Sequence, residues 1–119
     1  MFNFEKLDVW QKAVDFADLI YTNTRGFPAD ERFGLTTQLR RAAVSISSNI
    51  AEGSSRSSKI DFARFVEIAG GSVFEVVSQS FIARSQSFLG DGDFRRIYAA
   101  AEEQSRMLSD LRRSLLAAE

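Results

Sequence analysis

The sequence predicts an all-α protein, an antiparallel up-down-up-down four-helix bundle. In four segments, apolar residues recur at the three- and four-residue spacings that gather side chains on one face of a helix. The connections between these segments are short, so consecutive helices are expected to be antiparallel neighbours. The chain has 119 residues, of which 45% are hydrophobic. This is enough for one core, so we expect a single domain over residues 1–119.

The first predicted helix covers residues 9–25. Asp8 is placed to cap it, and Gln11, three residues on, is placed to return the bond in a capping box. Gly26 and Pro28 end the helix. Its apolar stripe consists of Trp10, Ala13, Val14, Ala17, Ile20 and Tyr21.

The second predicted helix follows Pro28, which is tolerated in a first turn. Gly34 is expected to interrupt the helical turn that starts there, and Gly53 is expected to be the C-cap. The apolar stripe between these glycines consists of Leu35, Leu39, Ala42, Ala43, Ile46 and Ile50.

The third predicted helix covers residues 59–89. Ser58 and Asp61 form a capping box at its start, and the glycines from Gly90 onward end it. One apolar face consists of Phe62, Phe65, Ala69, Val73, Val76 and Ala83.

The fourth predicted helix is capped by Asp91 or Asp93, and Arg112 and Arg113 lie near its negative end. Its stripe consists of Phe94, Ile97, Tyr98, Ala101, Leu108, Leu111 and Leu115. With this helix, the four segments complete the predicted bundle.

The helix predicted over residues 59–89 carries a second apolar stripe, although a bundle core needs only one stripe per helix. One interpretation is a seam against another copy of the chain, which a cyclic oligomer would bury. The alternative is that these side chains sit at helix–helix boundaries and widen the core of one chain. The candidate interface residues are Gly70, Phe74, Val77, Phe81 and Phe88.

Small and polar residues crowd the segment 40–53. Ser45, Ser48 and Asn49 are mediocre helix formers, so we expect their side chains to hydrogen-bond to neighbours, with a solvated face as the alternative. Glu52 lies unfavourably near the negative end of the helix dipole. We expect a nearby arginine or the loop backbone to compensate the negative charge of Glu52.

Charge is nearly balanced over the chain, with 15 Lys and Arg against 16 Asp and Glu, but it is uneven along it. Residues 25–64 carry seven basic and four acidic side chains, whereas residues 65–94 carry one and four. A phosphate-contacting patch is therefore a hypothesis for the corner between the second and third helices. The alternative is a solvated rim of ion pairs. The candidate nucleic-acid-binding residues are Arg40, Arg41, Arg56, Lys59 and Arg64.

Histidine and cysteine are absent from the sequence. Their absence excludes disulfides, imidazole or thiolate zinc sites, cysteine nucleophiles and an imidazole general base. A bundle-type di-iron centre would need Glu-x-x-His pairs, and no glycine-rich phosphate loop occurs. We therefore predict a non-enzyme with no catalytic residues, no metal and no cofactor.

The sequence also gives an expectation about location. No uncharged apolar run approaches the roughly 20 residues that span a bilayer, and Glu5, Lys6 and Asp8 stand where a signal peptide would be apolar. We predict a cytoplasmic protein that has no membrane partner.

Several blocks of the sequence together resemble a known family. They read Leu7-x-Val9-Trp10-x-x-Ala13, Phe27-Pro28-x-x-Glu31-x-Phe33-Gly34-Leu35-x-x-Gln38, Arg41-Ala42-Ala43-x-Ser45-Ile46-x-x-Asn49-Ile50-Ala51-Glu52-Gly53 and Gly71-Ser72-x-x-Glu75. The chain resembles the four-helix bundle family encoded in intervening sequences of bacterial 23S ribosomal RNA genes, the so-called S23 ribosomal protein family. The ribosomal label follows the location of the genes.

This family is in turn similar to the accessory protein of diversity-generating retroelements, which implies a bundle that forms a five-membered ring. The expected function is therefore a homo-oligomeric, pentameric assembly or interaction module with no small-molecule substrate. The alternative is an accessory protein that binds RNA, or a nucleic-acid enzyme, through the basic patch.

Overall fold

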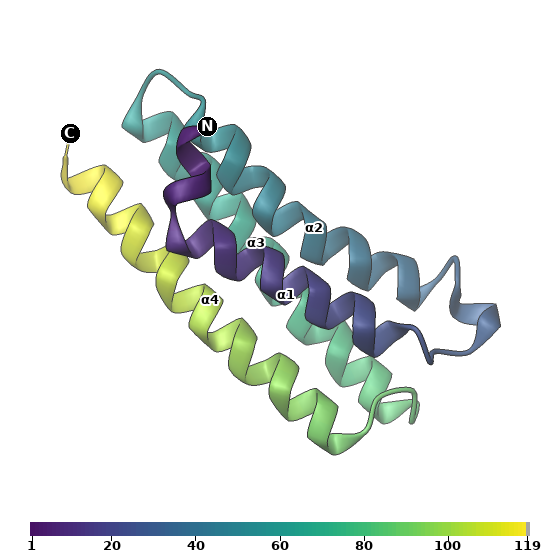
Figure 1. The fold of residues 1–119 in the computed structure, drawn as a ribbon. Coiled ribbons are helices and arrows are strands. Elements are labelled where there is room, and N and C mark those ends of the chain that lie inside the picture. Colours follow the sequence, from purple (N-terminus) through teal and green to yellow (C-terminus); the bar gives the residue numbers. More distant parts are fainter. Residues whose placement is uncertain (119) are drawn as a thin grey trace.

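Four α-helices make up most of the computed structural model, which describes residues 1–118 (Figure 1). They are α1 (Asp8–Thr24), α2 (Leu35–Ser54), α3 (Lys59–Ser85) and α4 (Asp91–Ala117). Two 3₁₀ helices, η1 (Asn3–Lys6) and η2 (Ala29–Glu31), precede α1 and α2, and no strand occurs within the described residues. The predicted fold class, an all-α four-helix bundle, is confirmed.

Hydrogen bonds between α2 and α3 show that these two helices run antiparallel, and Figure 1 shows the same for the other consecutive helices. Gln38 near the start of α2 meets Gln79 near the end of α3, whereas Ser45 further along α2 meets the earlier Ser72. The helices pack in the cyclic order α1, α2, α3, α4, with α4 returning against α1. The connections α1–α2 and α3–α4 therefore lie at one end of the bundle, and the α2–α3 connection lies at the other (Figure 1).

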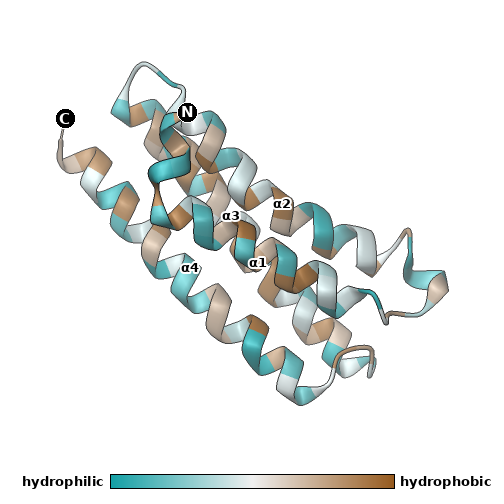
Figure 2. Cartoon of the chain, in the orientation of Figure 1, coloured by the Kyte–Doolittle hydropathy of each residue, from teal (hydrophilic) through white to brown (hydrophobic). Residues whose placement is uncertain are grey.

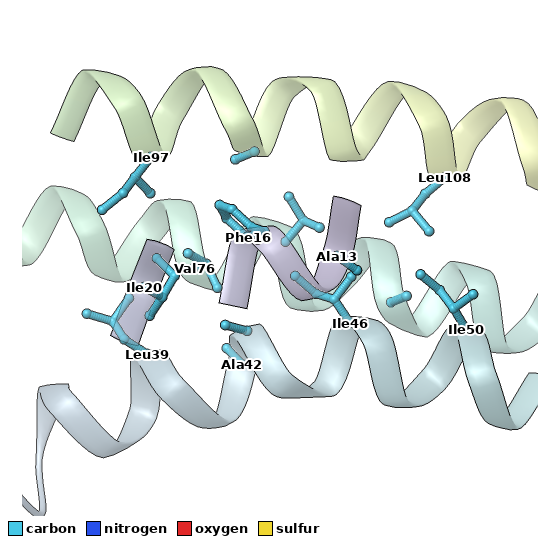
Figure 3. Packing of buried hydrophobic residues seen from close by; sticks show 14 of the residues in the cluster. Ala13, Phe16, Ile20, Leu39, Ala42, Ile46, Ile50, Val76, Ile97 and Leu108 are labelled. Carbon is cyan, nitrogen blue, oxygen red and sulfur yellow. The ribbon is translucent and has the colours of Figure 1, made fainter. Parts of the chain in front are cut away.

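The core lies between the inward faces of all four helices (Figure 3). Hydrophobic and hydrophilic residues alternate along each helix, as Figure 2 shows, so that one face of each can be buried. The large side chains that are almost fully buried include Ile20, Leu39, Ile46, Ile50, Val66, Val73, Val76 and Leu108.

The buried face of α1 differs from the predicted stripe. Trp10 and Tyr21 lie at the edge of this face or outside it, and Trp10 packs edge-on against Phe4 of η1, with ring centroids 4.9 Å apart. Because α1 packs against both α2 and α4, its buried face is centred between these two neighbours. The residues of α1 that are buried are Val9, Ala13, Phe16, Ile20 and Thr24.

The predicted capping box at α1 is wrong. The helix begins at Asp8, and the N-cap is Leu7, which makes no side-chain capping bond. The Gln11 amide instead donates to the Glu5 carbonyl oxygen at 2.8 Å. Only Leu7 separates η1 from α1, so Asp8 is the first residue of the helix and not the residue before it.

Gly53 is not the C-cap of α2, because the helix continues through Ser54. Gly53 is buried against α3, where an added Cβ would lie 2.7 Å from the Phe65 Cβ atom and 2.8 Å from Phe62 Cδ1. The glycine therefore serves the close approach of two helices.

The third helix ends four residues before the predicted position, at Ser85. Ser87 adopts a left-handed conformation, with φ 64°. The N–H groups of Phe88 and Leu89 both donate to the Ala83 carbonyl oxygen, at 2.9 and 3.3 Å, and this closes the helix end. Phe88 therefore lies in the connection, where its ring packs 5.8 Å from that of Phe27, and its inclusion in the α3 stripe was wrong.

The starts of η2, α2 and α3 follow the sequence more closely. η2 begins directly after Pro28, Gly34 is the N-cap of α2, and the Ser58 hydroxyl accepts a bond from the Asp61 N–H at 3.1 Å. At α4 the N-cap is Gly90, without a side-chain bond, so the predicted caps Asp91 and Asp93 are wrong.

By length and composition alone, α3 would be apolar enough to cross a membrane. In the structure it packs between α2 and α4, and 39% of its most apolar window is buried. The apolar residues on the inner side of α3 serve helix packing, whereas Ile68, Phe74 and Phe81 are exposed.

Candidate functional site

The outward side of α3 carries large apolar side chains that the core does not bury. Phe74 is 70% exposed and Phe81 is 44% exposed, while Gly70 and Val77 are half-buried next to α4. Four of the five predicted interface residues thus share one side of α3, and Phe88 does not. Because Phe74 projects into solvent, widening of the core does not account for it.

Three isoleucines of α3 that the sequence reasoning missed are also exposed. Ile60, Ile68 and Ile82 are 44%, 54% and 51% exposed. We call Ile60, Ile68, Phe74, Phe81 and Ile82 together the outer face of α3. The sequence contains a signal for these isoleucines, because they are large apolar residues that belong to neither predicted stripe of this helix.

A groove between α3 and α4 lies beside the outer face. It has a volume of 340 Å³ and mostly apolar walls that include Val73, Phe74, Val77, Phe81, Tyr98 and Ala101. A second hollow of 380 Å³ continues along the same pair of helices, and Phe74 and Ser105 line both. Phe74 therefore stands between two depressions of what we call the α3–α4 groove.

Stacked aromatic rings form one end of this groove. Phe81 packs edge-on against Phe94 with centroids 4.8 Å apart, and Tyr98 lies 5.9 Å from Phe94. The guanidinium of Arg84 covers the Phe94 ring at 3.9 Å. Such ring and cation–π contacts hold the side chains in fixed positions, so this end of the groove is a preformed apolar wall.

The five basic candidates do not form the single patch that was predicted. Arg40 and Arg41 lie in the first half of α2, whereas Arg56, Lys59 and Arg64 lie at the α2–α3 corner. At 1.5 Å per residue, Arg40 lies about 21 Å along the helix axis from Ser54, where α2 ends just before Arg56. The structure therefore divides the predicted site into two.

Ion pairs engage two of the three basic residues at the corner. Arg56 contacts Glu52 at 2.9 Å and stacks over the Phe65 ring at 4.6 Å, and Arg64 contacts Asp61 at 3.6 Å. The expected partner of Glu52 is confirmed as an arginine. Arg56 and Arg64 therefore agree with the alternative interpretation of the corner as a solvated rim of ion pairs.

Arg40 has a different environment. Its Nε–H donates to Thr24 Oγ1 at 2.9 Å, and its guanidinium lies 4.6 Å from the centre of the Tyr21 ring. Within residues 1–118, neither Arg40 nor Arg41 belongs to an ion pair. Both line a 480 Å³ hollow on the α1–α2 side, which we call the basic groove; its other lining residues are Tyr21, Thr37, Val44 and Ser45.

Ser45 and Asn49 hydrogen-bond to neighbouring residues, as predicted, and Ser45 joins α2 to α3. Ser45 Oγ lies 2.9 Å from Ser72 Oγ, and the Asn49 amide donates to the Ser45 hydroxyl and carbonyl oxygens at 3.0 and 2.8 Å. Ser48 is exposed, so the alternative of a solvated face holds for it.

Acidic residues do not gather into a metal site in the part of the chain that the structure describes. Within residues 1–118, no group of three or more Asp and Glu side chains is placed to hold a metal ion. The two surface features with a defined geometry are therefore the α3–α4 groove with the outer face, and the basic groove.

The comparison with protein families finds a match over residues 5–110 to the family described as 23S rRNA-intervening sequence protein. The chain belongs to this family. In this member of the 23S rRNA-intervening sequence family, some of the residues that suggested the resemblance lie at the α2–α3 contact, where Ser45 meets Ser72 and Gly53 lies against Phe65.

Among solved structures, the chain is similar to a protein of unknown function from the S23 ribosomal protein family of Bacteroides thetaiotaomicron, whose crystal structure was determined at 1.70 Å. The TM-score is 0.77 at 22% identity, covering 87% of this chain and 96% of that chain. At this identity the similarity concerns the four-helix fold. No curated protein matches the chain.

Proposed function

We propose that this protein is a non-enzymatic, cytoplasmic assembly module that forms a homo-oligomeric ring through the outer face of α3 and the α3–α4 groove. The observation that carries the proposal is Phe74, a large side chain that is 70% exposed between two depressions of the α3–α4 groove, one of which has mostly apolar walls. The number of copies, five, comes from the resemblance to the accessory protein of diversity-generating retroelements.

The dimensions of the bundle favour an interface along its length. The principal extents are 46 × 22 × 20 Å. A long side thus offers about 900 Å², close to the roughly 800 Å² per partner of a standard interface, whereas an end offers only about 400 Å². The outer face and the α3–α4 groove both lie along a long side.

A second copy is a suitable partner for this side because the surface is apolar and the chain has little net charge. Contiguous exposed apolar groups commonly mark interaction sites. With a net charge of −1, copies of the chain repel one another only weakly. Burial of Phe74 and Phe81 between copies would remove from water two side chains of the groove that the monomer leaves exposed.

Native mass spectrometry and light scattering would test this proposal. The wild-type protein should give a mass of several chains, five in the expected ring, whereas Phe74→Ser should shift the mass toward one chain. Leu116→Ser is the matched control, because Leu116 is also exposed at 40% but lies in the last turn of α4. Circular dichroism would verify that both variants are helical.

A wild-type protein that stays monomeric at high concentration would overturn the proposal. An unchanged oligomer mass for Phe74→Ser would exclude the α3–α4 groove as the interface.

A second candidate function, binding of RNA, rests on the basic groove. Arg40 is oriented by Thr24 and Tyr21 and stands next to Arg41 without an acidic partner in the described residues. Two such arginines suit contacts to phosphate oxygens. The double variant Arg40→Ala/Arg41→Ala should retain less RNA, and its RNA retention should depend less on the salt concentration. Arg56→Ala with Arg64→Ala, which removes paired arginines, should have less effect.

A further inference from the structure

The basic groove carries a local positive charge, although the chain as a whole is nearly neutral. The two stretches of chain that supply its lining residues, 19–29 and 35–51, contain three arginines and no aspartate or glutamate. The arginines at the α2–α3 corner are different, because acidic residues of the same corner pair with two of them. The basic groove is therefore the surface of this chain that best suits an anionic ligand.

Acidic residues on the neighbouring elements reduce this charge without occupying the arginines. In sequence and in helix register, the acidic residues next to the groove are Asp18, Asp30, Glu31 and Glu75. Glu31 accepts the Leu35 N–H at 3.0 Å, and Glu75 accepts a bond from the Gln79 amide at 3.1 Å. None of the four forms an ion pair with Arg40 or Arg41, so both guanidinium groups can bind an anion from outside.

Arg40 is held in one orientation by α1. Its Nε–H donates to Thr24 Oγ1 at 2.9 Å, its Nη2 group donates to the Tyr21 carbonyl oxygen at 3.5 Å, and the guanidinium lies over the Tyr21 ring. These bonds use the Nε side of the guanidinium and leave the pair of N–H groups at its far end for a ligand. Such a pair binds two oxygens of one phosphate, and its fixed orientation lowers the entropy cost of binding.

Apolar surface lies beside the two arginines. Tyr21 is 38% exposed and Val44 is 42% exposed, and both line the same 480 Å³ hollow as Arg40 and Arg41. This volume is within the range of about 300–1,000 Å³ that is common for ligand sites. The groove thus suits a ligand that combines a flat apolar part with an anionic part a few bonds away.

We propose that the basic groove binds a nucleoside phosphate unit, with the phosphate on Arg40 and Arg41 and the base against Tyr21 and Val44. Unpaired bases stack on aromatic rings and on guanidinium planes, whereas a duplex keeps its bases covered. The ligand is therefore a free nucleotide or one unit of a single strand. This proposal deepens the second candidate function, because it requires RNA that binds here to be single-stranded.

Fluorescence anisotropy with a short labelled RNA strand, and with the duplex of the same sequence, would test this. The single strand should bind roughly tenfold more tightly than the duplex. Tyr21→Leu removes the ring and keeps apolar bulk, so it should raise the dissociation constant of the single strand roughly fivefold or more. Tyr21→Phe keeps the ring and should retain the wild-type affinity.

Arg56 provides a matched control for Arg40. Its guanidinium also lies 4.6 Å from the centre of an aromatic ring, that of Phe65, but it pairs with Glu52. Arg40→Gln should raise the dissociation constant of the single strand roughly tenfold, whereas Arg56→Gln should leave it unchanged. Circular dichroism would verify that all variants are helical.

Competition experiments distinguish the two sources of the ligand. Displacement of the strand by a nucleoside 5′-monophosphate would support a free nucleotide, whereas displacement only by unlabelled single strand would support a strand. Displacement by polyglutamate as effective as that by nucleotides would overturn the proposal, because the groove would then bind any polyanion.

The outcomes also separate this proposal from the second candidate function. Equal affinity for single strand and duplex, unchanged in Tyr21→Leu, would overturn the nucleotide site and leave RNA binding through backbone phosphates. Binding of the monophosphate without binding of any strand would overturn RNA binding alone. If neither bound, both would be refuted.

Discussion

Gly53 shows how a single residue can carry a different role from the one its position suggests. A glycine near the end of an amphipathic segment usually marks a C-cap, but here the helix continues to Ser54. Gly53 faces α3, and the Phe62 ring and the Phe65 Cβ atom occupy the space where a Cβ would lie. The close approach of α2 and α3 therefore depends on the absence of a side chain.

Replacement of Gly53 by alanine should lower the free energy of unfolding by about 1–3 kcal/mol, the usual cost of overpacking a core. Urea denaturation followed by circular dichroism measures this change. Gly26→Ala is the control, since no atom lies within 4 Å of the position of its Cβ and its φ is not positive. If Gly53→Ala and Gly26→Ala had the same free energy of unfolding, α2 and α3 could move apart without loss of stability, and the prediction would be wrong.

At the scale of the helix, α3 illustrates the limits of a pattern based on one face. Its buried side includes Ala69, Val73 and Val76, as predicted, but it also includes Ser72, Gln79 and Ser80. Its outward side carries Phe74 and the exposed isoleucines. Apolar residues therefore surround much of the helix, because it serves the core on one side and presents a surface on the other.

The start of α3 depends on the N-cap Ser58. Its hydroxyl accepts the Asp61 N–H at 3.1 Å, a bond that a water molecule would otherwise have to supply. Ser58→Ala should lower the free energy of unfolding by about 1 kcal/mol. Thermal or urea unfolding measures the loss, and Ser57→Ala, at an exposed neighbouring position, should have an effect of at most a few tenths of a kcal/mol.

At the scale of the whole molecule, the bundle has two dissimilar long sides. The α3–α4 side carries the apolar groove, and the α1–α2 side carries the basic groove with Arg40 and Arg41. In the cyclic order of the helices these are opposite sides of the bundle. One molecule can therefore present the first side to another copy and leave the second accessible to a different partner.

Self-association should make the thermal stability of the protein depend on its concentration. Binding that occurs only in the folded state stabilises that state by mass action. The melting temperature of the wild type should rise as the protein concentration increases a hundredfold, whereas that of Phe74→Ser should change little. Differential scanning calorimetry would measure both. A wild-type melting temperature independent of concentration would contradict the assembly proposal.

The sequence was sufficient for the class of fold, the number of helices and the start of α3. These are local properties: the periodicity of apolar residues selects the helix, and Ser58 caps it through a neighbour three residues away. The exposed residues Phe74 and Phe81 could also be identified, because a helix with two apolar stripes has one stripe more than its core requires.

The tertiary structure decided what depends on residues far apart in the chain. The buried face of α1 was set by its two neighbours, α2 and α4, and so Phe16 replaced Trp10. The bonds to the Ala83 carbonyl ended α3 before Phe88, and the length of α2 separated Arg40 from Arg56. Helical periodicity follows from local spacing, whereas burial and proximity follow from which helices meet, and only the packed bundle determines this.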